Sequence, residues 1–147
     1  MHMKLKLESD LKDAMRSGDI LRKNTLRLAL SSIRLAEIDR GIQLDENAVI
    51  AILQKEIKSH QESIEDAQRA GRPELEQAAR AEINVLQVYL PQALSPEELE
   101  VQAKQVIAEV GAASLRELGQ VMKVLLPRLA GRATGDQVSQ VVRKLLQ

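Results

Sequence analysis

Apolar residues recur at helical spacing along nearly the whole chain, and no segment sustains the polar-apolar alternation that a half-buried strand requires. Tyr89 is the only aromatic residue, so a core has to be built from Leu, Ile, Val, Ala and Met. Sheets are enriched in aromatic and β-branched residues, and this composition therefore disfavours them. We predict an all-α fold, for which 147 residues provide one or two small domains.

Helix start and stop signals divide the chain into seven predicted helices. Four of them, at about residues 4–17, 19–40, 45–71 and 73–89, are expected to form an antiparallel helical bundle. The helix at 19–40 carries two apolar lines along its surface instead of one. These lines are Leu26, Leu30, Ile33 with Glu37, and Leu21, Leu28 with Leu35.

Leu90-Pro91 interrupts the helical pattern, and the spacing of Ser95 and Glu98 predicts a capping box that starts a new helix. We therefore predict an N-terminal domain at residues 3–93 and a compact three-helix domain at residues 94–147. In the second domain, Ser114 and Glu117 predict another capping box, and Pro127 is expected to kink or end the sixth helix. Thr134 to Gln137 is expected to open the last helix.

The sequence lacks the residues that several classes of protein require for their function. The chain has no cysteine, so it contains neither disulfides nor a thiol nucleophile, which fits a cytoplasmic protein. No phosphate loop is present, and one internal histidine, His60, provides no partner for a metal pair or a catalytic serine. The apolar run at residues 48–53 is far shorter than the roughly 20 residues of a membrane span. We therefore expect no metal, no cofactor and no membrane partner, and we see no catalytic arrangement.

His60 lies on the apolar stripe of the third predicted helix. A histidine in such a position is most often a core or interface residue that a neighbour satisfies. The alternative is contact with a partner, because Lys55 and Lys58 precede it and would form a cationic edge.

Basic residues are distributed unevenly, although the chain has 21 Lys+Arg and 21 Asp+Glu. Residues 110–147 contain six basic against two acidic residues, a local balance of +4. A cluster of this kind is what binding to phosphates requires, whereas the alternative is a solvated helix face. The candidate phosphate-binding residues are Lys123, Arg128, Arg132, Arg143 and Lys144.

Short segments throughout the chain match one known family in order and spacing. They are Ala14-Met15-Arg16, Leu26-Arg27-Leu28, Lys55-Glu56-Ile57-Lys58, Glu62-Ser63-Ile64, Ala70-Gly71-Arg72, Tyr89-Leu90-Pro91, Leu94-Ser95-Pro96-Glu97-Glu98-Leu99, Gly111-Ala112-Ala113-Ser114, Gly119-Gln120-Val121-Met122-Lys123, Leu126-Pro127 and Gly131-Arg132-Ala133-Thr134-Gly135. With these segments the chain resembles the GatB/YqeY family, whose stand-alone YqeY-like members are similar to the C-terminal tail of the B subunit of the glutamine-dependent tRNA amidotransferase. Its motif glycines correspond here to Gly119, Gly131 and Gly135.

The resemblance implies two helical domains and three competing functions. The first is an RNA-binding accessory module with tRNA as the first candidate, because the amidotransferase tail helps to hold tRNA. The second is a carbon–nitrogen ligase with glutamine as amido-N-donor, acting alone or as an accessory subunit of an amidotransferase. The third is a helical adaptor that binds other protein subunits through the stripe containing His60.

Overall fold

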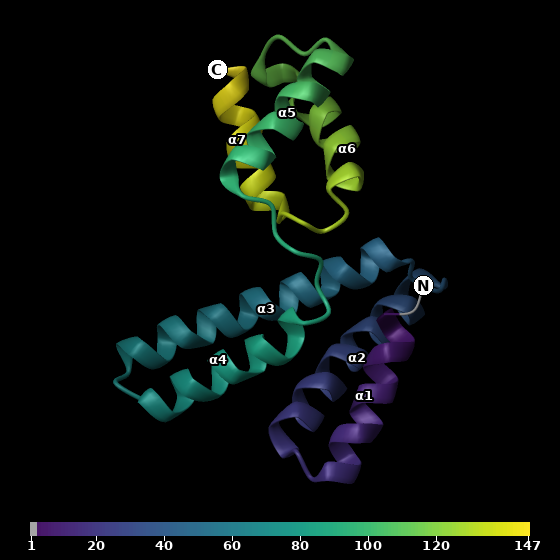
Figure 1. Ribbon diagram of the computed structural model, residues 1–147, viewed down its shortest axis with the longest axis vertical. Coiled ribbons are helices and arrows are strands. Elements are labelled where there is room, and N and C mark those ends of the chain that lie inside the picture. The colour runs from purple at the N-terminus through teal and green to yellow at the C-terminus, as the bar shows by residue number, and fades with distance from the viewer. Residues whose placement is uncertain (1–2) are drawn as a thin grey trace. The chain divides into compact units, whose positions relative to one another are not determined.

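The computed structural model describes residues 3–147, and these form two compact units, one ending at Leu90 and one from Pro91 to Gln147 (Figure 1). Every regular element among the described residues is a helix, which confirms the predicted all-α fold. We refer to the stretch ending at Leu90 as unit 1 and to Pro91–Gln147 as unit 2.

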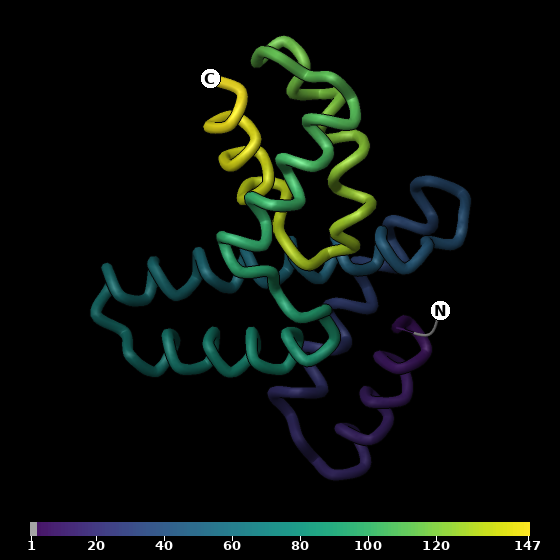
Figure 2. The backbone as a smooth tube through the Cα atoms, turned by 45° about the horizontal axis from the view of Figure 1, so that its top comes forward, coloured from purple at the N-terminus to yellow at the C-terminus, as the bar shows by residue number. Residues whose placement is uncertain are grey.

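Unit 1 consists of two helical hairpins. Figures 1 and 2 show α1 (Met3–Ser17) beside α2 (Ile20–Arg40), and α3 (Glu46–Arg69) beside α4 (Pro73–Gln87). The helix starts are set by local capping. The Asp19 carboxylate accepts a hydrogen bond from the Arg22 N–H at 3.2 Å, and the Asp45 carboxylate accepts one from the Ala48 N–H at 2.8 Å.

The core of unit 1 is made of aliphatic side chains from all four helices, together with Tyr89, which follows α4. On α2, Leu26, Leu30 and Ile33 are buried, whereas Leu28 and Leu35, on the opposite side of the same helix, are 52% and 60% exposed. The α3 stripe that includes His60 also faces inward. The buried members of this core are Leu7, Leu26, Ala29, Leu30, Ile33, Val49, Leu53, Ile57, Ile64, Ala79, Ile83, Leu86 and Tyr89.

A polar cluster around Asp10 joins α1, α2 and the end of α4. The Tyr89 hydroxyl donates a hydrogen bond to the Asp10 carboxylate, and Lys6 Nζ lies 3.2 Å from it. Arg22 completes the cluster, with its Nη2 atom 3.7 Å from the same carboxylate. Burial acts to raise the pKa of Asp10, but the hydrogen bonds from Tyr89 and Lys6 outweigh it and hold this pKa below its usual value.

Unit 2 contains α5 (Pro96–Val110), a 3-10 turn (Leu115–Glu117), α6 (Leu118–Leu129) and α7 (Gly135–Leu146). The predicted capping box at Ser95 and Glu98 is present, and Thr134 with Gln137 forms a second one at α7. One apolar stripe from each helix meets in the core. Its buried members are Leu99, Ala103, Val106, Val121, Leu125, Leu129, Ala133, Val138, Val142 and Leu146.

The capping box predicted at Ser114 and Glu117 is wrong. The Ser114 side chain makes no capping hydrogen bond, and the Glu117 carboxylate instead accepts one from the Ala113 N–H at 2.9 Å. Residues 115–117 form a 3-10 turn, so the third residue after Ser114 is not in the first turn of an α-helix as the box requires.

The end of α6 differs from what Pro127 alone predicts. The helix continues two residues beyond Pro127 to Leu129, and Ala130 then ends it with φ +50°. Proline in the last turn removes one N–H donor, and the left-handed residue that ends the helix follows three residues later, at Ala130. A left-handed alanine carries a steric penalty of about 1–2 kcal/mol that glycine does not.

We therefore expect Ala130→Gly to stabilise unit 2. Relief of the left-handed strain exceeds the entropy that glycine adds to the unfolded chain, for a net gain of about 0.5–1 kcal/mol in the free energy of unfolding. Chemical denaturation measures this gain. The matched control is Ala108→Gly, at an exposed α-helical position of α5, where glycine is expected to destabilise by a similar amount. An equal decrease in the free energy of unfolding in both variants would contradict the assignment of strain to Ala130.

Candidate nucleic-acid interface

The five predicted phosphate-binding residues are all exposed and all lie in unit 2, but they do not form one cluster. Lys123 and Arg128 are on α6, Arg132 is in the following loop, and Arg143 and Lys144 are in the last turn of α7. Figures 1 and 2 show the α6–α7 loop at one end of the unit, with the end of α7 at the other. The eight residue steps from Gly135 to Arg143 alone rise by about 12 Å.

Arg128 is paired within the unit. Its guanidinium binds both carboxylate oxygens of Glu109 on α5, with Nη1 to Oε1 at 2.9 Å and a second, shorter bond from Nη2 to Oε2. This hydrogen-bonded pairing lowers the pKa of Glu109 and raises the pKa of Arg128. A phosphate would have to compete with a bidentate carboxylate for this side chain.

Arg132 is also used inside unit 2. Its Nε donates to the carbonyl oxygen of Gln92 at 2.9 Å, and its own carbonyl accepts from the Leu94 N–H at 2.9 Å. These two bonds attach the segment before α5 to the α6–α7 loop. The side chain therefore has a structural role that its sequence position, 40 residues from Gln92, did not indicate.

The other three predicted cations bind no carboxylate among the described residues. Lys123 and Lys144 are exposed and form no ion pair or hydrogen bond with the described residues, and Arg143 donates only to the Ser139 hydroxyl at 3.2 Å. Arg116, which contributes to the basic balance but is not among the five, lies in the 3-10 turn. Figures 1 and 2 show this turn at the same end of unit 2 as the end of α7.

The three motif glycines differ in backbone conformation. Gly131 has φ +82°, a conformation that favours glycine. Gly119 and Gly135 lie in the first turns of α6 and α7. A Cβ atom at Gly119 or Gly135 would meet nothing within 4 Å, so no contact within the chain requires glycine there.

His60 is satisfied by a neighbour. Its Nδ1 lies 2.7 Å from Glu82 Oε2 on α4, and its side chain is only 12% exposed. The five apolar members of its α3 stripe, from Ile50 to Ala67, are buried. This stripe is therefore part of the unit 1 core and offers no surface to an adaptor's partner.

The comparison with known families decides the identity. A model of the Yqey-like protein family matches residues 4–146, which is nearly the whole chain. The chain belongs to the YqeY-like family. The resemblance to stand-alone YqeY-like proteins inferred from the short motifs is thus confirmed. In this YqeY-like protein, no helix among residues 3–147 has the length and apolarity needed to cross a membrane.

Curated relatives of this YqeY-like protein are fungal. One from Lachancea thermotolerans is 39% identical over 99 residues, which are 67% of this chain and 53% of that protein. Another, from Pyrenophora tritici-repentis, is 32% identical over 96% of this chain and 79% of its own length. A third, from Eremothecium gossypii, is 37% identical over 91% of this chain and 71% of its own length. Each is named "Altered inheritance of mitochondria protein 41, mitochondrial".

These names correct one expectation. The cytoplasmic location inferred from the sequence was wrong, because relatives that align with most of the chain are named as mitochondrial proteins. The inference rested on the absence of cysteine. A chain without cysteine forms no disulfide in any compartment, so this absence does not distinguish one compartment from another.

Proposed function

We propose that this YqeY-like protein is an RNA-binding accessory module that contacts backbone phosphates through unit 2. The observation that carries the proposal is the set of exposed cations on the 3-10 turn, α6 and α7 that have no carboxylate partner among the described residues. The set consists of Arg116, Lys123, Arg143 and Lys144. Arg128 and Arg132 are left out of it because their guanidinium groups already bind Glu109 and Gln92.

Phosphate contacts fit these side chains better than base recognition does. Base-specific recognition of single-stranded RNA uses aromatic side chains as stacking platforms, and the only aromatic residue is Tyr89, which is buried in unit 1. Exposed Lys and Arg side chains neutralise phosphates whatever the base sequence. We therefore propose recognition of the shape and charge of a folded RNA, with tRNA as the first candidate.

Binding should depend strongly on salt. Neutralising three to four phosphates gives a log-log slope of roughly −0.7 to −0.9 per phosphate, which is a loss of about 20- to 150-fold between about 50 and 200 mM salt. Lys123→Glu combined with Lys144→Glu should weaken binding to total tRNA and make this slope shallower by about 1.4 to 1.8. Neither change breaks an ion pair among the described residues. Fluorescence anisotropy with labelled tRNA measures both quantities.

The matched control is Lys12→Glu combined with Lys55→Glu, which makes the same change of charge at two exposed lysines of unit 1. Equal weakening by both double variants would show that the interface is not confined to unit 2. If neither double variant binds differently from the unchanged chain, the RNA proposal fails. Glutamine hydrolysis or ATP consumption that co-elutes with the pure chain would favour the ligase alternative instead.

A further inference from the structure

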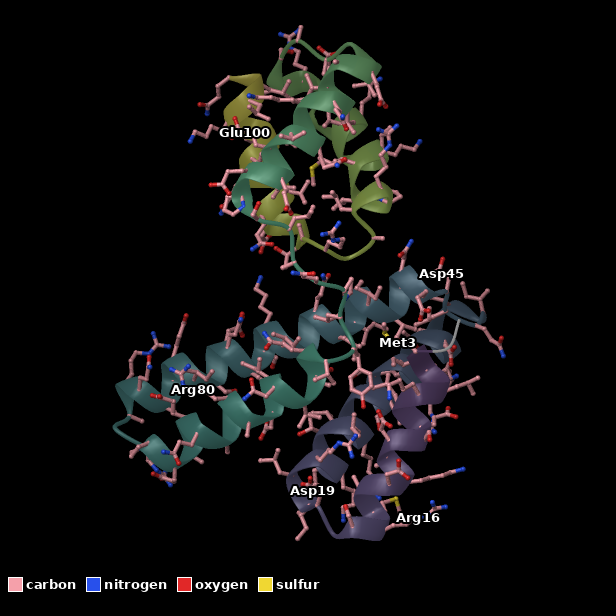
Figure 3. The ribbon with its side chains drawn as sticks, viewed as in Figure 1. Met3, Arg16, Asp19, Asp45, Arg80 and Glu100 are labelled. Carbon is pink, nitrogen blue, oxygen red and sulfur yellow. The ribbon has the colours of Figure 1, made fainter. Side chains whose placement is uncertain are left out.

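The second apolar line on α2 has no partner within the unit. Its apolar members Leu21, Leu28 and Leu35 repeat every seven residues, with Ile38 after them, and Asn24 and Ser31 lie between them so that the positions alternate by three and four. Leu28, Leu35 and Ile38 are 52%, 60% and 76% exposed. In Figure 3 the labelled Asp19 marks the start of α2, and the labelled Asp45 lies beyond its end. We call this line the α2 seam. It consists of Leu21, Asn24, Leu28, Ser31, Leu35 and Ile38.

The seam has the spacing of a coiled coil. Leu21, Leu28 and Leu35 occupy heptad position a, and the other three residues occupy position d. Leu26 and Ile33, in the unit core, lie at the opposite position f. One exposed leucine on a helix needs no explanation, whereas a line that keeps the a/d spacing over most of α2 indicates a surface for another helix.

The two edges of the seam carry opposite charges. Arg27 and Arg34 occupy position g on one edge, and Asp39 occupies position e on the other. Glu56 of α3 adds a second carboxylate to the acidic edge, because Ser32 at position e donates a hydrogen bond to Glu56 Oε1 at 2.6 Å. Arg34 Nη2 lies 4.0 Å from Glu8 and its charge also acts on Glu37, whereas Arg27 and Asp39 have no partner among the described residues.

We propose that the α2 seam binds the same seam of a second copy of this chain, with the two helices parallel. In a parallel pair, position g of one helix faces position e of the other, so the basic edge of each copy meets the acidic edge of its neighbour. Arg34 then faces Asp39 of the second copy, and Arg27 faces its Ser32–Glu56 pair. An antiparallel pair would place the two basic edges against each other.

The polar seam residues fit this arrangement. The Asn24 side chain is exposed and has no hydrogen-bond partner among the described residues. An amide carries both donors and acceptors, so two copies of Asn24 in the same layer can bond to each other. Asn24, Leu21 and Leu28 also line a recess next to His60 and Glu82, whose Nδ1 and Oε2 atoms lie 2.7 Å from each other. A buried asparagine layer also fixes which residues of two helices face each other.

Cross-linking tests the orientation directly, because the chain has no cysteine of its own. Mild oxidation of Ile38→Cys should give a disulfide-linked pair if the helices are parallel. In an antiparallel pair, position 38 would face position 21, about 26 Å along the helix from position 38 of the second copy. The matched control is Leu75→Cys on α4, where the leucine is 49% exposed but off the seam, and no cross-link is expected.

Sedimentation of the full chain tests the pairing itself. The mass should rise from 16.3 kDa at low concentration toward twice that value as the concentration is raised to roughly 200 µM and above, as expected for a weak pair. Leu28→Lys with Leu35→Lys should leave only the single-chain mass, while circular dichroism stays unchanged. Asp39→Arg should weaken pairing by about three- to tenfold, and adding Arg34→Asp should restore it.

Three outcomes would overturn the proposal. The first is a single-chain mass at every concentration, which would leave the seam to a different protein. The second is a pair that Leu28→Lys with Leu35→Lys does not disrupt. The third is a disulfide between Ile38→Cys and Leu21→Cys chains in a mixture, without any between two Ile38→Cys chains, which would show antiparallel helices.

Discussion

A chain carrying Leu125→Ala is expected to lose the folded structure of unit 2 while unit 1 stays folded. Leu125 is fully buried among the three helices of unit 2. Shortening such a side chain to alanine costs about 2–5 kcal/mol. A single core of fewer than about 70–80 residues rarely supplies more than about 3–5 kcal/mol, so this one change removes most or all of the stability of unit 2.

Hydrogen exchange resolved along the chain measures the effect, since amides of residues 91–147 should exchange fast while those of α1 to α4 stay protected. The control is the adjacent Leu126→Ala. Leu126 is 38% exposed, so its truncation leaves no enclosed cavity and is expected to cost less than about 1 kcal/mol. Loss of protection in both units would show that the two fold as one cooperative unit, contrary to this prediction.

Tyr89 is expected to keep its proton far above the pH at which a free tyrosine ionises. Burial, the hydrogen bond to Asp10 and the negative charge of that carboxylate all raise the pKa of Tyr89 well above its usual value of about 10. The unfolded chain releases this proton near pH 10, whereas the folded chain retains it. The contribution of Tyr89 to stability is therefore complete below about pH 10 and decreases by about 1.4 kcal/mol per pH unit above it.

The measurement is specific, because the chain has one Tyr and no Trp, and tyrosinate absorbance therefore reports this hydroxyl alone. The absorbance should appear only together with the loss of helical signal in unit 1. The control is Tyr89→Phe, in which the free energy of unfolding no longer falls above about pH 10 through this residue. Its free energy of unfolding at neutral pH should be lower by about 1–2 kcal/mol, because the hydrogen bond to Asp10 is lost. Ionisation near pH 10 with the helices intact would contradict the buried hydrogen bond.

The sequence predicted the helices well wherever their signals are local. The Asp45 cap and the boxes at Ser95 and Thr134 join residues three positions apart, so their geometry is present in the sequence spacing itself. Ser114 has the same spacing with Glu117, yet its segment forms a 3-10 turn. The same three-residue spacing therefore predicted a capping box at Ser114 wrongly, because the backbone there forms a 3-10 turn before it enters the α-helix.

The candidate site was predicted only in part, because charge is visible in a sequence and pairing is not. All five cations are exposed, as a phosphate-binding role requires. Arg128 is bound to Glu109, 19 residues away, and Arg132 to Gln92, 40 residues away. Partners this distant in sequence come together only when α5, α6 and the connecting loops pack. Lys123 and Lys144 are thus the stronger candidates for phosphate contacts. Nothing in the sequence indicates that Arg128 and Arg132 are paired within the unit and these two lysines are not.

The two apolar lines of α2 show most clearly what the sequence determines and what it does not. The spacing of hydrophobic residues by itself determined that residues 20–40 form a helix and that Leu26 and Leu28 lie on opposite lines of it. Both lines are apolar, so neither hydropathy nor propensity states which one is covered. Packing against the other helices of unit 1 buried Leu26, Leu30 and Ile33 and left Leu28, Leu35 and Ile38 exposed. Only the tertiary structure decided this, because burial depends on which neighbours reach each face, and those neighbours come from distant parts of the chain.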